Sequence, residues 1–161
     1  MGVWIDRCRI AAVLLSCLLA SPRLWAGDAT PAPTPEPPQD TPAEIGRRAV
    51  QAASLLVDVA HYRLGSSSRH AVDCSGLVKL SYESAGVPMP RTTKALLHVG
   101  PTVPPASARP GDLLFYRFRP SGRLHVAIYA GAGRAIHASP RHNRVREIDI
   151  HEARWQKHLV T

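Results

Sequence analysis

Three side chains of this sequence have the types that nucleophilic catalysis needs. Cys74 lies between Asp73 and Ser75 in the stretch "AVDCSGLVKL", and His125 and His137 lie in two apolar segments further along. A cysteine thiolate is a strong nucleophile, a nearby imidazole can act as its base, and a second polar ring can orient that base. The set therefore predicts covalent catalysis by a thiol.

Cys74 is expected to be the only cysteine of the mature protein, because the other two fall in an N-terminal segment with the features of a leader peptide. Most free cysteines are small buried hydrophobes. A core cysteine does not need polar neighbours, however, and a lone thiol in an oxidising compartment is exposed to oxidation and wrong pairing. We therefore interpret Cys74 as a functional residue.

The residues after Cys74 have the spacing of an amphipathic helix. Apolar and small residues recur three and four positions apart as far as Ala85, and Gly86 with Pro88 is a stop signal. Asp73 is then the expected N-cap, and the thiol lies in the first helical turn. Free N–H groups and the helix dipole stabilise negative charge at that end of a helix.

The two histidines are expected on neighbouring strands. His125 alternates with Ala127 in "LHVAIYA", and His137 belongs to the next strand, "RAIHAS". A hairpin turn centred on Gly131 places His125 directly opposite His137, with Cβ atoms about 5 Å apart. A slip of one residue would put the two rings on opposite faces of the sheet.

A second interpretation uses the same side chains as metal ligands. Cys74, His125 and His137 with an open fourth position would form a zinc set. The sequence has no close-spaced ligand motif such as CxxC or HExxH. A thiol site that needs no metal or other cofactor is therefore the preferred interpretation.

The elements that must position these residues indicate an α+β domain. Helical spacing predicts a first helix over residues 43–63, ahead of the cysteine helix. Strands are expected at 112–119, at two segments within 123–139 and at 143–150, followed by one or two helical turns at 151–158. Helices first and antiparallel strands afterwards are typical of α+β folds.

Residues 1–26 have the pattern of a signal peptide. Arg7 and Arg9 precede an apolar run, and cleavage is expected after Ala26, with Ala29 as the second choice. This pattern predicts export, with the protein periplasmic or secreted and acting in the cell envelope. A lipoprotein alternative would acylate Cys17 and anchor the protein to a membrane, although the apolar run continues past that residue.

Residues 27–42 form the expected linker, and residues 43–161 form the expected catalytic domain. The stretch "TPAPTPEPPQDTP" is rich in proline, which favours an extended conformation. The formal net charge is +8, but the sequence shows no cluster of basic and aromatic side chains. We therefore expect no nucleic-acid partner, whereas an acidic polymer or membrane surface fits the charge.

Four motifs together resemble the NlpC/P60 family of papain-like cysteine peptidases. They are "DCSGLVKLSYESAGVPMPRT", "RPGDLLFY", "HVAIYAGAGRAIHAS" and a tryptophan near the end, and they occur in the family's order with similar separations. The resemblance implies a papain-like fold in which the cysteine helix packs on an antiparallel sheet. It also implies that Cys74 is the nucleophile, His125 the base and His137 the orienting residue.

The same resemblance implies an exported endopeptidase that hydrolyses amide bonds in peptidoglycan stem peptides, with γ-D-glutamyl–diamino acid bonds as the favoured target. A D,D-endopeptidase that cuts peptide cross-links and a non-catalytic module that binds wall peptides are the alternatives. The expected partners are stem peptides, and we expect a monomer.

Tyr62, Asp73 and Ser75 match the positions that hold the stem peptide or the oxyanion in this family. The sequence departs from the family pattern nearby: Ser66 replaces a glycine that often follows the tyrosine, and Leu96 lies near the usual place of a glutamine. These departures leave the three proposed catalytic residues in place, but they bear on substrate preference.

Overall fold

The chain divides into two units, Met1–Pro37 and Pro38–Thr161. In this computed structural model the structure describes residues 40–161. The predicted signal peptide, the lipidation alternative at Cys17 and almost all of the predicted linker lie outside the described residues. The first helix begins at Pro42, next to the predicted start of the domain.

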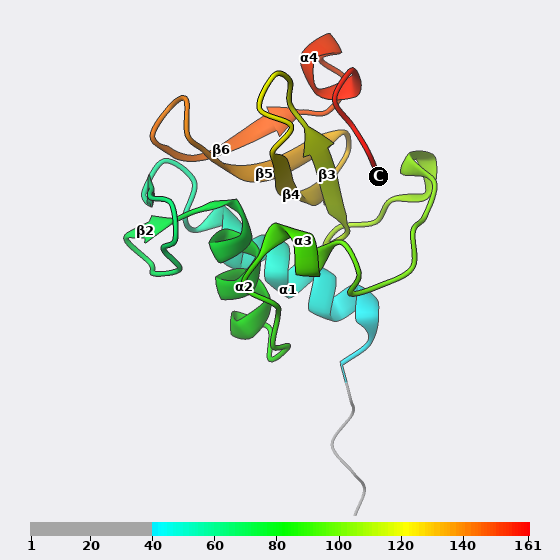
Figure 1. Cartoon of the computed structure of the whole chain (residues 1–161). Coiled ribbons are helices and arrows are strands. Elements are labelled where there is room, and N and C mark those ends of the chain that lie inside the picture. Colours follow the sequence, from blue (N-terminus) through cyan, green and yellow to red (C-terminus); the bar gives the residue numbers. More distant parts are fainter. Residues whose placement is uncertain (1–39) are drawn as a thin grey trace, which may run out of the picture. The chain divides into compact units, whose positions relative to one another are not determined.

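Helices come first in the chain and most strands follow, which confirms the predicted α+β class (Figure 1). The elements in chain order are α1 (Pro42–Ser54), β1 (His61–Tyr62), β2 (Ala71–Val72), α2 (Cys74–Ser84), α3 (Thr93–Leu96), the 3-10 helix η1 (Pro105–Ser107), β3 (Leu113–Arg117), β4 (Leu124–Gly131), β5 (Arg134–Ser139), β6 (Arg144–Asp149) and α4 (Ala153–Gln156). Among the described residues, no helix has the length and apolar character that crossing a membrane requires.

The strands form one six-stranded sheet in the order β2-β1-β6-β5-β4-β3. The pairs from β1 through β6, β5 and β4 to β3 are antiparallel, and only the short strands β1 and β2 pair in parallel. The C-terminal residues cover the outer edge of β3: the N–H of Phe115 donates to the carbonyl of Thr161 at 2.6 Å. This pairing protects an edge that would otherwise be open to another chain.

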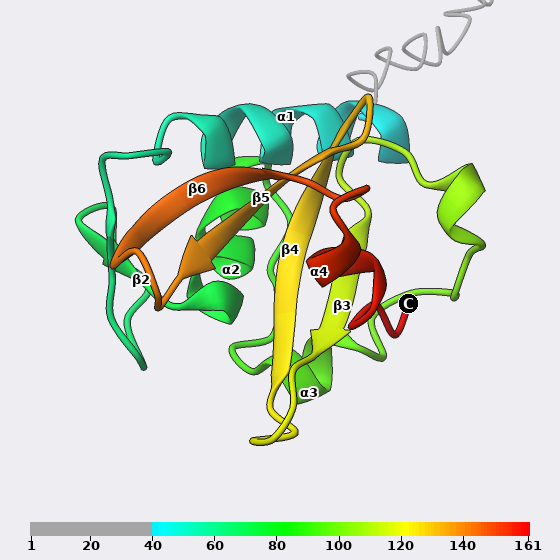
Figure 2. The same ribbon diagram turned by 90° about the horizontal axis from the view of Figure 1, so that it is seen from above.

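The sheet is covered on both faces. Helices α1, α2 and α3 lie against one face and α4 against the other (Figure 1). Val126 and Ile128 of β4 belong to the core cluster shared with α2, whereas Ala127 belongs to a second cluster around Trp155 of α4. Strong twist turns β5 and β6 away from β3 and β4 (Figure 2).

Helix α1 is shorter than the sequence indicates. It ends at Ser54 instead of continuing to Arg63. The next residues join the sheet: the N–H of Asp58 donates to the carbonyl of Val145 at 3.0 Å, and the N–H of Val145 donates to the carbonyl of Ala60 at 3.0 Å. Pairing with β6 therefore overrides the helical preference of this stretch.

The β4–β5 turn is not centred on Gly131. Gly131 pairs with Arg134, and the two residues between them, Ala132 and Gly133, have φ of 49° and 75°. Two successive left-handed residues form a tight turn whose twist suits a hairpin. The prediction that the two histidines are directly opposed is therefore wrong, because the turn lies further along the chain.

A bulge at Ala130 decides on which face the histidines lie. With the turn alone, Ile128 would be opposite His137, and the two rings would be on different faces. The pairing shifts by one residue at the bulge, so that Ile128 pairs with Ile136. His125 and His137 thus return to one face, as diagonal neighbours rather than a directly opposed pair.

Candidate active site

Local sequence builds the end of α2 that carries the thiol. Asp73 is the N-cap, and its Oδ1 accepts a hydrogen bond from the N–H of Gly76 at 2.7 Å. Cys74 is the first residue of the helix and is half-buried. A Cβ on Gly76 would lie 2.1 Å from the carbonyl oxygen of Ser66, so the close approach requires glycine. The predicted helix and its cap are confirmed.

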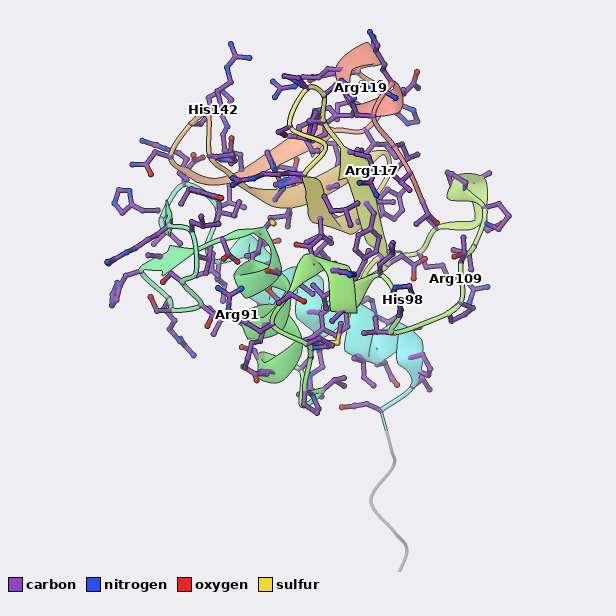
Figure 3. All side chains as sticks on the ribbon, in the orientation of Figure 1. Arg91, His98, Arg109, Arg117, Arg119 and His142 are labelled. Carbon is purple, nitrogen blue, oxygen red and sulfur yellow. The ribbon has the colours of Figure 1, made fainter. Side chains whose placement is uncertain are left out.

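Asp73 also forms an ion pair with Arg91. Arg91, from the segment between α2 and α3, donates to both carboxylate oxygens of Asp73 at 2.8 Å (Figure 3). It also donates to Ser75 Oγ at 3.0 Å and to the carbonyl of Ser66 at 3.1 Å. Burial raises the pKa of the Asp73 carboxyl, but the hydrogen bonds from Arg91 and from backbone N–H groups outweigh this effect and lower the pKa from its ordinary value.

Asp73 and Ser75 are largely occupied by contacts within the protein. Each is 5% exposed, and the Ser75 hydroxyl donates to Asp73 Oδ1 at 3.2 Å. The Arg91 side chain is 33% exposed. Arg91 is therefore the member of this polar group that a ligand can reach most easily.

Thr93 and Tyr62 border the thiol. The Sγ of Cys74 lies 3.5 Å from Oγ1 of Thr93. Burial raises the pKa of Tyr62, with a further contribution from Cys74, and Arg123 acts in the opposite direction. Arg123 immediately precedes β4, so the start of the strand that carries His125 lies within electrostatic reach of the same tyrosine.

The two predicted catalytic histidines are in direct contact. Nε2 of His125 lies 2.9 Å from Nδ1 of His137, and the ring planes are nearly perpendicular at 84°. Trp155 packs edge-on against His137 with ring centroids 4.9 Å apart, and His137 is 5% exposed. Trp155 therefore shields this hydrogen bond from water, which strengthens it.

Both rings are neutral at neutral pH. Burial lowers the pKa of His125 to about 4, and the charge of Arg154 acts in the same direction. Burial also lowers the pKa of His137 to about 3, with contributions from His125 and Arg154. A neutral imidazole has one donor and one acceptor nitrogen, so the contact between the rings couples their tautomers.

The structure assembles the predicted site in part. Tyr62, Asp73 and Ser75 lie around Cys74, and the two histidines are joined to each other, but within residues 40–161 no hydrogen bond joins the thiol to either ring. Contacts between nucleophile and base are often long in a free enzyme and shorten with substrate.

Residues 40–161 contain no group of three or more His, Cys, Asp or Glu side chains placed to hold a metal ion. The alternative zinc set is therefore not assembled.

Sequence reasoning missed three residues that the structure places at the site. Arg91 had a signal, because a single arginine stands in "PMPRTT" and the N-cap aspartate needs a counter-charge. Thr93 and Arg154 had none, because the first belongs to a short helix that was not predicted and the second comes from α4, which packs on the face of the sheet that carries the histidines.

The model of the NlpC/P60 family matches residues 59–161, which include all the predicted site residues. The chain belongs to the NlpC/P60 family. The resemblance recognised from the four motifs is therefore confirmed, as is the predicted fold class.

The curated relatives are named as endopeptidases and hydrolases. The probable endopeptidase p60 of Listeria monocytogenes is 37% identical over 99 residues, 62% of this chain and 20% of the relative. The murein DD-endopeptidase MepS/murein LD-carboxypeptidase of Escherichia coli is 36% identical over 97 residues, 60% of this chain and 50% of the relative. The γ-DL-glutamyl hydrolase of Bacillus subtilis is 34% identical over 121 residues, 74% of this chain and 29% of the relative. The alignments thus span half or less of each relative.

Solved structures of the family share the fold. NlpC1 of Trichomonas vaginalis superposes with a TM-score of 0.64 at 29% identity, covering 72% of this chain and 42% of the other. The peptidoglycan hydrolase RipB of Mycobacterium tuberculosis gives a TM-score of 0.60 at 28% identity, covering 72% and 61%. RipD of the same organism, described as a non-catalytic domain adapted to peptidoglycan binding, gives 0.53 at 26% identity, covering 68% and 90%.

Proposed function

We propose that this protein is an exported cysteine endopeptidase that hydrolyses amide bonds in peptidoglycan stem peptides, with γ-D-glutamyl–diamino acid bonds as its target. In this proposal, residues 1–26 direct export, residues 27–42 are a linker and residues 43–161 are the catalytic domain. The observation that carries the proposal is the hydrogen bond between His125 and His137 in a family member whose α2 begins with a capped cysteine. The names of the relatives support the substrate class.

The proposed reaction has two steps. In the first, Cys74 Sγ attacks the carbonyl carbon of the scissile amide, and His125 takes the thiol proton and gives it to the leaving amine, which departs as the thioester forms. In the second, His125 takes a proton from water, the hydroxide attacks the thioester, and the thiol leaves with that proton. His137 holds the tautomer of His125 through their 2.9 Å contact. When substrate binds, Cys74 Sγ gives up its 3.5 Å contact with Thr93 Oγ1 and moves within hydrogen-bond distance of His125.

The polar side chains beside the thiol are proposed to hold the part of the stem peptide that becomes the thioester. They are Tyr62, Asp73, Ser75 and Arg91. Tyr62 is half-buried next to Cys74, and its hydroxyl can bind the peptide or the oxyanion. Asp73 and Ser75 serve this side mainly by orienting the guanidinium of Arg91. Charge-assisted bonds of this kind are strong enough to select one peptide orientation.

Two alternatives are supported by particular relatives. The murein DD-endopeptidase name of MepS favours cleavage of cross-links, and the non-catalytic description of RipD favours wall binding without cleavage. The presence of all three proposed catalytic side chains favours an enzyme over a binding module. The partners are stem peptides in either case, and the site of action is the cell envelope.

The test is release of peptide fragments from purified peptidoglycan, identified by mass spectrometry. Cys74→Ala should lower the rate by several orders of magnitude, because it removes the covalent route, while circular dichroism shows the fold unchanged. Fragments that begin with a free diamino acid amine would identify the γ-D-glutamyl bond, and separated cross-linked dimers would identify the D,D-bond. Comparable digestion by Cys74→Ala would overturn the thiol mechanism.

A further inference from the structure

Two segments at one end of the sheet carry positive charge that the proposed reaction does not use. Residues 59–72 and 139–146 contain no Asp or Glu. Their basic side chains, all in exposed residues, are Arg63, Arg69, Arg141, Arg144 and Arg146, together with His61, His70 and His142. We call this set the basic surface.

Strand pairing brings the two segments together. β1 pairs with β6, with His61 opposite Arg144, and the N–H of His61 donates to the carbonyl of His70 at 2.9 Å. Arg144 and Arg146 alternate with the buried Val145, so the two arginines share one face of β6. The β1–β2 loop and the β5–β6 turn lie at the same end of the domain in both views (Figure 1 and Figure 2).

Little negative charge offsets the basic surface. Arg144 pairs with Asp58 at 3.7 Å, but the two side chains are 49% and 62% exposed, so water screens this pair. Among residues 40–161, the other four arginines of the surface form no ion pair. Glu147, the next residue of β6, pairs with Arg134 instead. The basic surface therefore attracts an anionic partner.

The basic surface also borders the most exposed large apolar side chains of residues 40–161. Leu55, Leu64 and Val59 are 73%, 70% and 65% exposed, against 49% or less for the others. Leu64 follows Arg63 in the β1–β2 loop, within the basic surface itself. Single exposed apolar residues are ordinary, but several in one short segment indicate an interaction site.

Positive charge next to exposed apolar side chains fits a lipid bilayer better than a hydrated polymer. Arginines attract anionic headgroups, and an apolar side chain that reaches the boundary with the acyl chains is removed from water. A soluble polyanion would satisfy the arginines equally well but would leave Leu64 in water.

We propose that the basic surface, together with Leu64, binds the surface of an anionic lipid bilayer. Tyr62 belongs to β1, and Cys74 follows β2 after a single residue. The bound protein therefore holds its thiol close to the membrane. This inference goes beyond the proposed function and does not depend on peptidase activity.

The first experiment measures amide hydrogen exchange of the full chain with and without vesicles. Vesicles of equal parts phosphatidylglycerol and phosphatidylcholine should slow exchange in residues 61–72 and 140–146. Residues 101–110, at the opposite end of the domain (Figure 1 and Figure 2), should be unaffected, and phosphatidylcholine vesicles should protect neither segment. Because exchange is read segment by segment, membrane contacts of the predicted signal peptide do not enter the result. Unchanged exchange in either segment overturns the proposal.

Charge variants test the arginines. The vesicle concentration that gives half of the protection should rise roughly fivefold in Arg141→Gln and in Arg144→Gln, the contribution of one arginine near an anionic membrane. Arg109→Gln is the matched control, because it removes the same charge far from His142 of the basic surface (Figure 3). It should keep the wild-type value. An equal rise in all three variants, or no rise in the first two, overturns the assignment of the surface.

Leu64→Ser separates a bilayer from a soluble polyanion. It should weaken protection by the anionic vesicles several-fold and leave binding to inorganic polyphosphate unchanged, because serine gains little at the acyl boundary. Val103→Ser, which changes an apolar side chain that is 41% exposed on the loop before β3, should leave both unchanged. Wild-type protection in Leu64→Ser would show that the surface attracts polyanions in general, and would overturn the bilayer proposal.

Discussion

The two sides of the site are built in different ways. On the thiol side, Asp73, Ser75 and Arg91 form a closed group in which each polar side chain has a partner. On the histidine side, two neutral rings meet through one hydrogen bond beside a cavity between β5, β6 and α4 in which, among residues 40–161, Arg146, Arg154, Asp149 and Glu152 form no ion pair.

This difference reflects how far apart the contributing residues are in sequence. The thiol side depends on a helix cap and on one arginine close by in the chain, so it forms with α2. The histidine side depends on a bulge, a turn and a tryptophan from α4, so it forms only when the sheet and α4 are in place. Variants should therefore affect the two sides differently.

The largest effect is expected at the histidines. His125→Ala, His125→Asn and His125→Gln should each lower kcat by roughly 10⁴-fold, because none of the new side chains exchanges protons near neutral pH. His137→Asn and His137→Gln should keep measurable activity, because an amide can still hydrogen-bond to the His125 ring, whereas His137→Ala should keep much less. Kinetics on a defined muropeptide would decide this.

Rescue by the amide variants marks His137 as a positioning residue, since a purely structural loss would not depend on hydrogen bonding. A higher activity of His125→Gln than of His137→Gln would reverse the assignment of base and orienting residue.

The next largest effect is expected from a change at Gly76, which packs against the group of Asp73, Ser75 and Arg91 on the thiol side. Gly76→Ala would place a Cβ 2.1 Å from the carbonyl of Ser66, which also accepts a bond from Arg91. We expect a loss of about 1–3 kcal/mol in the free energy of unfolding and a fall in kcat/KM. Gly100→Ala is the matched control, because nothing lies within 4 Å of its Cβ position. Equal urea-unfolding curves for the two variants would contradict this account.

The histidine side should also control the pH dependence. The base must be unprotonated, and burial lowers the pKa of His125 to about 4, so kcat/KM should persist as pH falls through 6.5 and decline near 4. Arg154→Gln should move this acid limb upward, because it removes a positive charge near the ring. An acid limb near 6.5 that Arg154→Gln does not move would contradict this expectation.

The same lowered pKa values affect stability. Between the unfolded value of about 6.5 and the folded values of about 4 for His125 and about 3 for His137, the unfolded chain binds more protons than the native protein. The free energy of unfolding should therefore fall as pH decreases through this window. Thermal unfolding at pH 7 and pH 5 measures the contribution.

The smallest effect is expected in the hairpin turn. Ala132 has φ of 49°, a conformation that costs an L-residue more than glycine, so Ala132→Gly should stabilise the protein by about 0.5–1 kcal/mol. Ala106→Gly changes an exposed alanine with an ordinary backbone conformation and should destabilise it. Urea unfolding compares the two, and a loss of stability in Ala132→Gly would show that the turn is not strained.

Sequence alone was sufficient for the features that depend on neighbouring residues. The helix that starts at Cys74, its Asp73 cap and the strands that carry His125 and His137 follow from spacing and capping rules. The family motifs were sufficient to recognise the papain-like fold. The assigned roles of Cys74, His125, His137, Tyr62, Asp73 and Ser75 remain proposals.

The tertiary structure decided what depends on residues distant in the chain. The early end of α1 follows from pairing with β6, and the contact between the two histidines follows from a bulge at Ala130 that no local pattern marks. Side-chain direction alternates with every residue of a strand, so one extra residue reverses a face. Long-range register therefore had to be observed, whereas a helix cap could be predicted, because a cap is complete within four residues and a strand pair is not.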